Sequence, residues 1–121
     1  MKDKRKKKKG IGLAFAINGL KEAFIREKNF RIHLAVAFFV LFISVYFRLT
    51  VIEWMFVLLM IHIVLITELI NSLMERLIDY LKPEIHPEAK IIKDISAAIV
   101  LIAAITSVII GFIIFIPKIL S

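Results

Sequence analysis

Cysteine is absent from the 121-residue sequence, which excludes disulfide bonds, cysteine-ligated zinc, iron–sulfur clusters and thiol catalysis. The side chains left for binding a metal ion are carboxylates and three histidines. Glycine is scarce as well, with four residues, and no G-x-x-x-x-G-K-[ST] motif occurs, so the chain lacks the loop that cradles phosphates in P-loop enzymes. Any nucleotide chemistry would therefore depend on a metal ion and on individually positioned side chains.

Apolar residues dominate the amino-acid composition. Hydrophobic residues make up 60% of the chain and the mean hydropathy is +0.89, which is too apolar for an ordinary soluble domain. A chain of this length forms one domain at most. The composition predicts an all-α integral membrane protein.

The basic residues are concentrated in a tail. Residues 1–10 contain seven of the 17 Lys and Arg residues and one of the ten acids, so the rest of the chain is nearly neutral. Such a block is expected to be disordered until a surface neutralises its charge. The partner could be anionic membrane lipid or nucleic acid. Because no aromatic residue interleaves the lysines and a hydrophobic body follows, we expect anionic lipid and no nucleic acid.

Three segments are predicted to cross the bilayer. Residues 95–116 carry no charge and would form a helix of about 33 Å, enough to cross the hydrocarbon core. The uncharged stretch 34–47 can be extended at both ends by residues whose polar tips snorkel to the interface. The stretch 54–67 meets no helix breaker until Pro83. The predicted spans are 31–50, 53–80 and 91–116, within a single domain of residues 11–121.

The distribution of Lys and Arg predicts the orientation of these spans. Eleven basic residues lie in residues 1–31 and four between the second and third spans, against one between the first two spans and one at the end. Basic loops remain in the cytoplasm. We therefore expect a protein of the cell membrane with its N-terminus and the loop 82–90 in the cytoplasm and its C-terminus outside.

An amphipathic surface helix is predicted over residues 11–29. Leu13, Ile17, Leu20 and Phe24 follow one another at steps of four, three and four, which places them on one helix face. A helix of this kind lies in the membrane interface. Glu27 follows Phe24 by three residues and so falls on the apolar side, where a carboxylate needs a partner.

A polar stripe occupies one face of the second predicted span. It lies within an arc of about 100° at 100° per residue and comprises Glu68, Asn71, Ser72, Glu75 and Asp79. Carboxylates facing lipid are costly, so the stripe should line a protein interior, a watery cavity or a metal site. The alternative is that the helix has left the membrane by Glu75, so that Glu75 and Asp79 are solvated and paired with Arg76, Lys82 or Lys90.

Acidic groups at this spacing suit phosphoryl chemistry. A pair of carboxylates can hold a magnesium ion that also binds phosphate oxygens, and a further carboxylate can act as a general base. Lys93, Asp94 and the loop 82–90 place cations at the same end of the protein. A small oligomeric transporter is a second interpretation, because carboxylates within the membrane also relay protons or cations. We interpret His33 and His62 as hydrogen-bonded structural residues.

These residues carry a resemblance to a known family. The string ELINSLMERLID over residues 68–79, followed by Lys93-Asp94 and a helix rich in small residues, resembles the signature of the prokaryotic diacylglycerol kinase family of small membrane lipid kinases. The similarity extends upstream through GLKEAFIREKNFR at residues 19–31. The details IEWM at residues 52–55 and the ending GFIIFIPK resemble the Gram-positive branch, whose members act chiefly as undecaprenol kinases. One departure is Leu73, where the family usually has alanine.

The resemblance implies a homotrimer of three-span protomers and ATP-dependent phosphorylation of a lipid alcohol, either undecaprenol or diacylglycerol. Glu68 would be the general base for the lipid hydroxyl and would bind the lipid together with Asn71. Glu27 and Glu75 would hold the Mg²⁺ bound to ATP. The remaining nucleotide-positioning residues implied by the resemblance are Asn71, Asp79, His86, Lys93 and Asp94.

Overall fold

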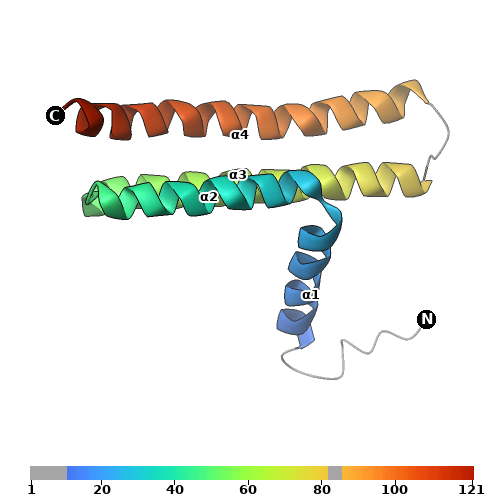
Figure 1. The fold of residues 1–121 in the computed structure, drawn as a ribbon. Helices are drawn as coiled ribbons and strands as arrows, with labels where there is room; N and C mark the ends of the chain where they lie inside the picture. The colour runs from blue at the N-terminus through green and yellow to red at the C-terminus, as the bar shows by residue number, and fades with distance from the viewer. Residues whose placement is uncertain (1–10, 82–85) are drawn as a thin grey trace.

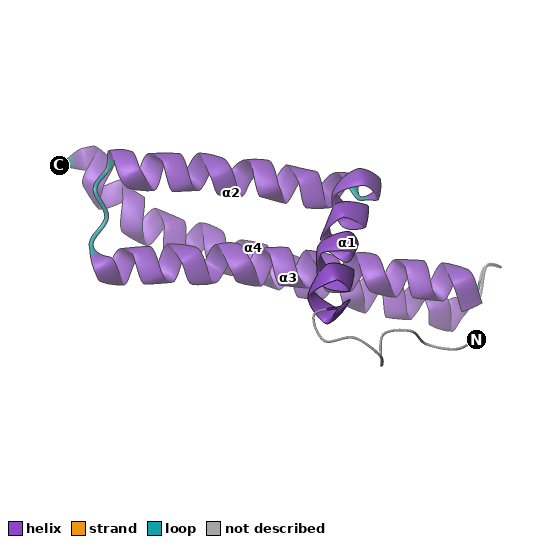
Figure 2. Cartoon of the chain, turned by 90° about the horizontal axis from the view of Figure 1, so that it is seen from below, coloured by secondary structure: helices purple, strands orange, loops and turns teal. Residues whose placement is uncertain are grey.

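The computed structural model describes residues 11–81 and 86–121, so the predicted tail at residues 1–10 and the loop residue Lys82 lie outside the described residues. This part of the chain consists of four α-helices. Helices α2, α3 and α4 run alongside one another, while α1 leaves them at a steep angle near the start of α2 (Figures 1 and 2). The helices are α1 (Ile11–Arg26), α2 (Lys28–Tyr46), α3 (Val51–Leu81) and α4 (Pro87–Leu120).

Helices α2, α3 and α4 are each long and apolar enough to cross a membrane, which confirms the prediction of three spanning helices. Helix α3 has 31 residues and α4 has 34, lengths of about 46 and 51 Å that exceed a hydrocarbon core of about 30 Å. Their ends must therefore project beyond it. The position of α1 in the membrane surface and the homotrimer remain predictions.

The helical conformation is interrupted between α1 and α2 at Glu27, two residues before the predicted end of the surface helix at 29. Glu27 has extended backbone angles (φ −110°, ψ 105°) and makes no side-chain capping bond to α2. The guanidinium of Arg31 donates to the carbonyl oxygens of Phe24 and Ile25 at 2.7 and 2.9 Å. Because these are carbonyls at the C-terminus of α1 that lack helical partners, Arg31 fastens the end of α1 to the start of α2.

Local capping also explains where α3 and α4 begin. The Thr50 amide donates to the Glu53 carboxylate and the Glu53 amide donates to the Thr50 hydroxyl, a reciprocal capping box at the start of α3. The predicted first span ends early, at Tyr46, because Arg48 adopts a positive φ of 55° in the turn. Helix α4 begins earlier than the predicted 91, because His86 caps it through Nδ1 and Pro87 occupies its first turn.

The hydrophobic core lies at the end of the bundle opposite α1. Leu49, Val57, Ile114 and Phe115 form it, and the Phe115 ring meets Phe47 edge to face at 6.1 Å. Small residues of α4 that repeat every seven residues are buried, which lets α3 and α4 approach closely. These residues are Ala89, Ser96 and Ala103. Most other large apolar side chains point outward, as expected for helices in contact with lipid.

Replacing Phe115 with alanine should destabilise the protein by about 2 kcal/mol or more, because truncating a buried aromatic residue leaves a cavity. Phe112, three residues earlier on α4, is 61% exposed and provides the matched control. Unfolding of each variant by sodium dodecyl sulfate in detergent micelles measures the difference. Equal unfolding midpoints for the two variants would show that this cluster does not hold the helices together.

Candidate active site

The polar stripe of α3 divides into a buried inner half and an exposed outer half. Glu68 is 3% exposed, and Asn71 and Ser72 are each 7% exposed. Glu75 and Asp79, further along the helix, are exposed. The inner residues of the stripe are therefore buried and its outer residues exposed, which combines features of the two interpretations. The expected pairing of the outer acids with Arg76 or Lys90 is wrong, because Arg76 pairs with Glu27, Lys90 with Asp94, and Asp79 with Lys93.

Three buried polar side chains have unpaired atoms. Asn71 Oδ1, Ser72 Oγ and Ser96 Oγ, the last from α4, make no hydrogen bond within the two described segments of the chain. Buried polar atoms in native proteins almost always have a partner. These atoms are therefore available to a ligand, to water or to a second protomer.

His33 of α2 is the ionisable residue that lies next to Glu68. Its Nε2 lies 3.7 Å from Glu68 Oε2, too long for a hydrogen bond but close enough for an electrostatic contact when the imidazole is protonated. From the sequence, His33 is interpreted as a structural residue near the interface, and its contact with Glu68 is not expected. The available signal was its position in the first span, and the sequence alone did not supply the register of α2 against α3.

An apolar groove leads away from His33. It has a volume of about 530 Å³ and lies between α2, α3 and α4, with His33 toward one end and Phe115 and Ile119 toward the other. The lining is almost entirely aliphatic and aromatic. A molecule with a long apolar tail could lie here with its polar end beside Glu68.

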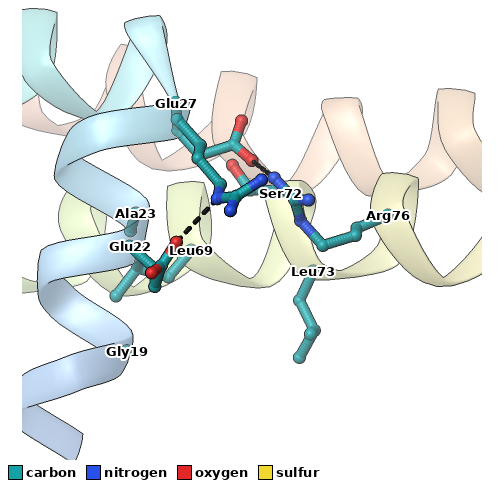
Figure 3. A pocket seen from close by; sticks show the side chains of 9 residues that line it. Gly19, Glu22, Ala23, Glu27, Leu69, Ser72, Leu73 and Arg76 are labelled. Carbon is teal, nitrogen blue, oxygen red and sulfur yellow. Dashed lines mark hydrogen bonds and ion pairs between the residues drawn. The ribbon is translucent and has the colours of Figure 1, made fainter.

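A second pocket, of about 410 Å³, lies between α1 and α3 and contains charges of both signs. Arg76 Nη2 lies 2.8 Å from Glu27 Oε1, and Arg26 Nε lies 2.6 Å from Glu22 Oε2 (Figure 3). The hydrogen bond from Arg26 holds the pKa of Glu22 below its ordinary value. The partner that the position of Glu27 requires is therefore Arg76, a pairing that the sequence pattern does not indicate.

The outer charges form two further ion pairs. Lys93 Nζ lies 2.5 Å from Asp79 Oδ1, which joins α4 to α3, and Lys90 Nζ lies 2.6 Å from Asp94 Oδ2 within α4. The structure thus brings Lys93 and Asp79 together, while Asp94 pairs with its own helix. Pairs this exposed contribute about 0 to 1 kcal/mol each, so a charged ligand can displace them at low cost.

His86 has a structural contact. Its Nδ1 accepts a hydrogen bond of 3.1 Å from the Glu88 amide and so caps α4. The rest of the ring is exposed, and the structure brings no other predicted site residue into contact with it among the described residues.

The side chains near Glu27 do not form a metal site built from protein ligands alone. No group of three or more His, Asp or Glu side chains that could hold a metal ion occurs in residues 11–81 and 86–121. Magnesium needs one or two carboxylates and completes its shell with water and phosphate oxygens. Glu27 lines the pocket between α1 and α3 and Glu75 is exposed, so either carboxylate is accessible to an ion that arrives with a nucleotide.

These features define a class of protein. A buried carboxylate lies beside an apolar groove, and a charged pocket opens at the same end of the bundle. This arrangement suits a membrane enzyme with one apolar and one charged substrate.

Comparison with known proteins gives the family. A sequence model of the family "Prokaryotic diacylglycerol kinase" matches residues 14–115, and the chain belongs to this family of membrane lipid kinases. An undecaprenol kinase of Bacillus subtilis is 39% identical over 100 residues, covering 83% of this chain and 81% of the relative. A diacylglycerol kinase of Helicobacter pylori is 36% identical over 93 residues, covering 77% and 73%. A diacylglycerol kinase of Synechocystis is 34% identical over 112 residues, covering 92% and 64%. Membership of a kinase family implies ATP as the phosphoryl donor.

Proposed function

We propose that this protein transfers the γ-phosphoryl group of ATP to the hydroxyl of undecaprenol. The observation that carries the proposal is the position of Glu68, which is buried and 3.7 Å from the His33 that lines the apolar groove. A lipid in the groove would place its hydroxyl at this carboxylate. Family membership favours a kinase over the transporter that the buried carboxylates alone would also allow.

In this proposal Glu68 is the general base. It accepts the proton of the lipid hydroxyl as the oxygen attacks the γ-phosphorus and the bond to the leaving ADP oxygen breaks. Asn71 lies one turn further along α3, and its Oδ1 has no partner among the described residues, so this oxygen can accept a hydrogen bond from the lipid or the nucleotide. His33 stabilises the ionised carboxylate when the imidazole is protonated.

The nucleotide would bind at the end of the bundle where α1, α3 and α4 carry their charges. Glu27 and Glu75 would hold Mg²⁺, which when bound neutralises charge on the phosphate oxygens. Lys93 would leave Asp79 to bind phosphate, and Asp79 would support the nucleotide from the opposite helix. Asp94 and His86 complete the proposed nucleotide-binding set.

The proposed assembly is a homotrimer with α1 in the cytoplasmic membrane surface and the C-terminus outside. The side-chain oxygens of Asn71, Ser72 and Ser96, which have no partner in residues 11–81 and 86–121, support a site completed by a ligand or by another protomer. Anionic lipid would neutralise the tail at residues 1–10, because each Lys or Arg near such a surface contributes about 1 kcal/mol.

The lipid preference can be measured directly. Purified protein in detergent micelles receives ATP labelled in its γ-phosphate, with undecaprenol and dioleoylglycerol at equal mole fractions. We expect undecaprenol to be favoured by about tenfold or more in kcat/KM, a difference of about 1.4 kcal/mol. Preference for dioleoylglycerol would indicate a diacylglycerol kinase instead, the activity for which the Helicobacter and Synechocystis relatives are named.

A further inference from the structure

The ion pair between Arg76 and Glu27 crosses between separate parts of the chain. It joins α3 to the junction of α1 and α2 over 49 residues of sequence, whereas the neighbouring Arg26–Glu22 pair lies within α1. Figure 3 shows both pairs at the same pocket. The pocket therefore contains two arginines, of which only Arg76 contacts the carboxylate proposed to bind the metal ion.

The surroundings of Glu27 explain why it needs this counter-ion. Its side chain is 23% exposed, against 47% for Glu22, so it is the less hydrated carboxylate of the two. Glu27 occupies the N-cap position of α2 but makes no capping bond, so the helix does not satisfy it. Arg76 compensates its charge and fixes its orientation toward α3.

The contact is built so that it can be released. The Arg76 side chain is 56% exposed, so its guanidinium is already partly hydrated and can move into water when another cation binds Glu27. A divalent cation on the Glu27 carboxylate would place two positive charges beside that guanidinium, and the two cations would repel each other. Binding of the metal ion to this carboxylate therefore weakens the ion pair with Arg76, and the ion pair in turn weakens metal binding.

We infer that Arg76 is a positioning residue that competes with the divalent cation for Glu27: it holds the carboxylate in place before the cation binds and releases it on binding. The inference rests on the proposed function, in which Glu27 is a metal ligand. It adds a residue that the resemblance to the family does not assign. If Arg76 competes in this way, the enzyme without nucleotide binds the cation more weakly than its carboxylates alone would.

Binding of Mn²⁺ without nucleotide tests the competition without any activity measurement. The free Mn²⁺ signal in electron paramagnetic resonance is titrated with wild type, Arg76→Gln and Arg26→Gln in detergent micelles. We expect Arg76→Gln to bind Mn²⁺ about two- to fivefold more tightly, the factor that a half-exposed ion pair supports. Arg26→Gln removes the same charge from the same pocket and should change the affinity less, because Arg26 pairs with Glu22.

Two further variants separate the possible outcomes. Arg76→Ala is a second neutral replacement that keeps α3 helical and cannot donate a hydrogen bond to Glu27 as glutamine can. Glu27→Gln identifies the metal ligand itself. If Glu27→Gln binds Mn²⁺ as tightly as wild type, the metal assignment in the proposed function fails, and this inference fails with it. If Glu27→Gln binds weakly but both Arg76 variants match Arg26→Gln or bind less tightly than wild type, the metal assignment stands and the competition alone is overturned.

Discussion

Replacing Glu68 with glutamine is expected to lower kcat for lipid phosphorylation by about 10³-fold, because a positioned general base accelerates a reaction by about 10²- to 10⁴-fold. Glutamine keeps the size of the side chain but cannot accept the proton of the lipid hydroxyl. The protein should remain folded, since Glu68 is buried with no hydrogen bond or ion pair other than the 3.7 Å contact to His33 among the described residues. The measurement is the rate of phosphoryl transfer at saturating ATP and lipid, with thermal unfolding followed on the same samples.

Glu53→Gln is the matched control for this prediction. Glu53 lies on the same helix, in the first turn of α3, and pairs with Lys118 at 2.9 Å at the opposite end of the bundle. This substitution should leave kcat within about twofold, because Glu53 and Lys118 lie far from Glu68 along the bundle and glutamine can still accept the hydrogen bond from the Thr50 amide. Glu68→Gln with most of its activity retained would show that Glu68 is not the base.

Replacing Glu27 with glutamine is expected to raise the Mg²⁺ concentration needed for half-maximal activity by about tenfold or more, since a neutral amide is a poorer ligand for this hard cation than a carboxylate. Excess Mg²⁺ should restore part of the rate, which a merely structural defect would not allow. The measurement is a Mg²⁺ titration of phosphoryl transfer at fixed ATP.

Glu22→Gln controls for the charge of the α1–α3 pocket. Glu22 lines the same pocket as Glu27 but pairs with Arg26 in the exposed part of α1. Its replacement should leave the Mg²⁺ dependence near that of wild type. A shift of equal size in both variants would indicate that the net charge of the pocket, and not ligation by Glu27, sets the Mg²⁺ requirement.

The sequence was sufficient to predict the spanning helices because their signals are local. Uncharged stretches and the lack of a breaker before Pro83 indicate three long helices. The helix ends are also local where caps define them, as at Thr50 and Glu53. The early end of α1 at Arg26 was not predictable in this way. No glycine or proline marks it, and Arg31 and Arg76 stabilise the break from other parts of the chain.

The candidate site could be predicted as a set of residues but not as a set of contacts. Helical periodicity alone places Glu68, Asn71 and Ser72 on one face, and the structure buries all three. The pairs His33–Glu68 and Arg76–Glu27 depend on how far α3 is shifted along α2, and Asp79–Lys93 depends on the register of α3 against α4. Such registers come from packing between helices, so the sequence alone could not choose among the partners.

The packing of α4 shows the same limit on a smaller scale. A seven-residue repeat of Ala97, Ala104 and Gly111 indicates a seam of small residues. In the structure Ala104 and Gly111 are half-buried and Ala97 is exposed, while Ser96 and Ala103, one position earlier, are fully buried. A shift of one residue rotates a helix face by about 100°, and periodicity alone does not fix which small residues meet the neighbouring helix.

The most direct test of the account is transfer of the γ-phosphate from ATP to a lipid alcohol by the purified protein, with Mg²⁺ present or removed by a chelator. We predict labelled undecaprenyl phosphate in the presence of Mg²⁺ and no labelled lipid after chelation. Protein that is shown to be folded and still labels neither undecaprenol nor diacylglycerol would contradict the account.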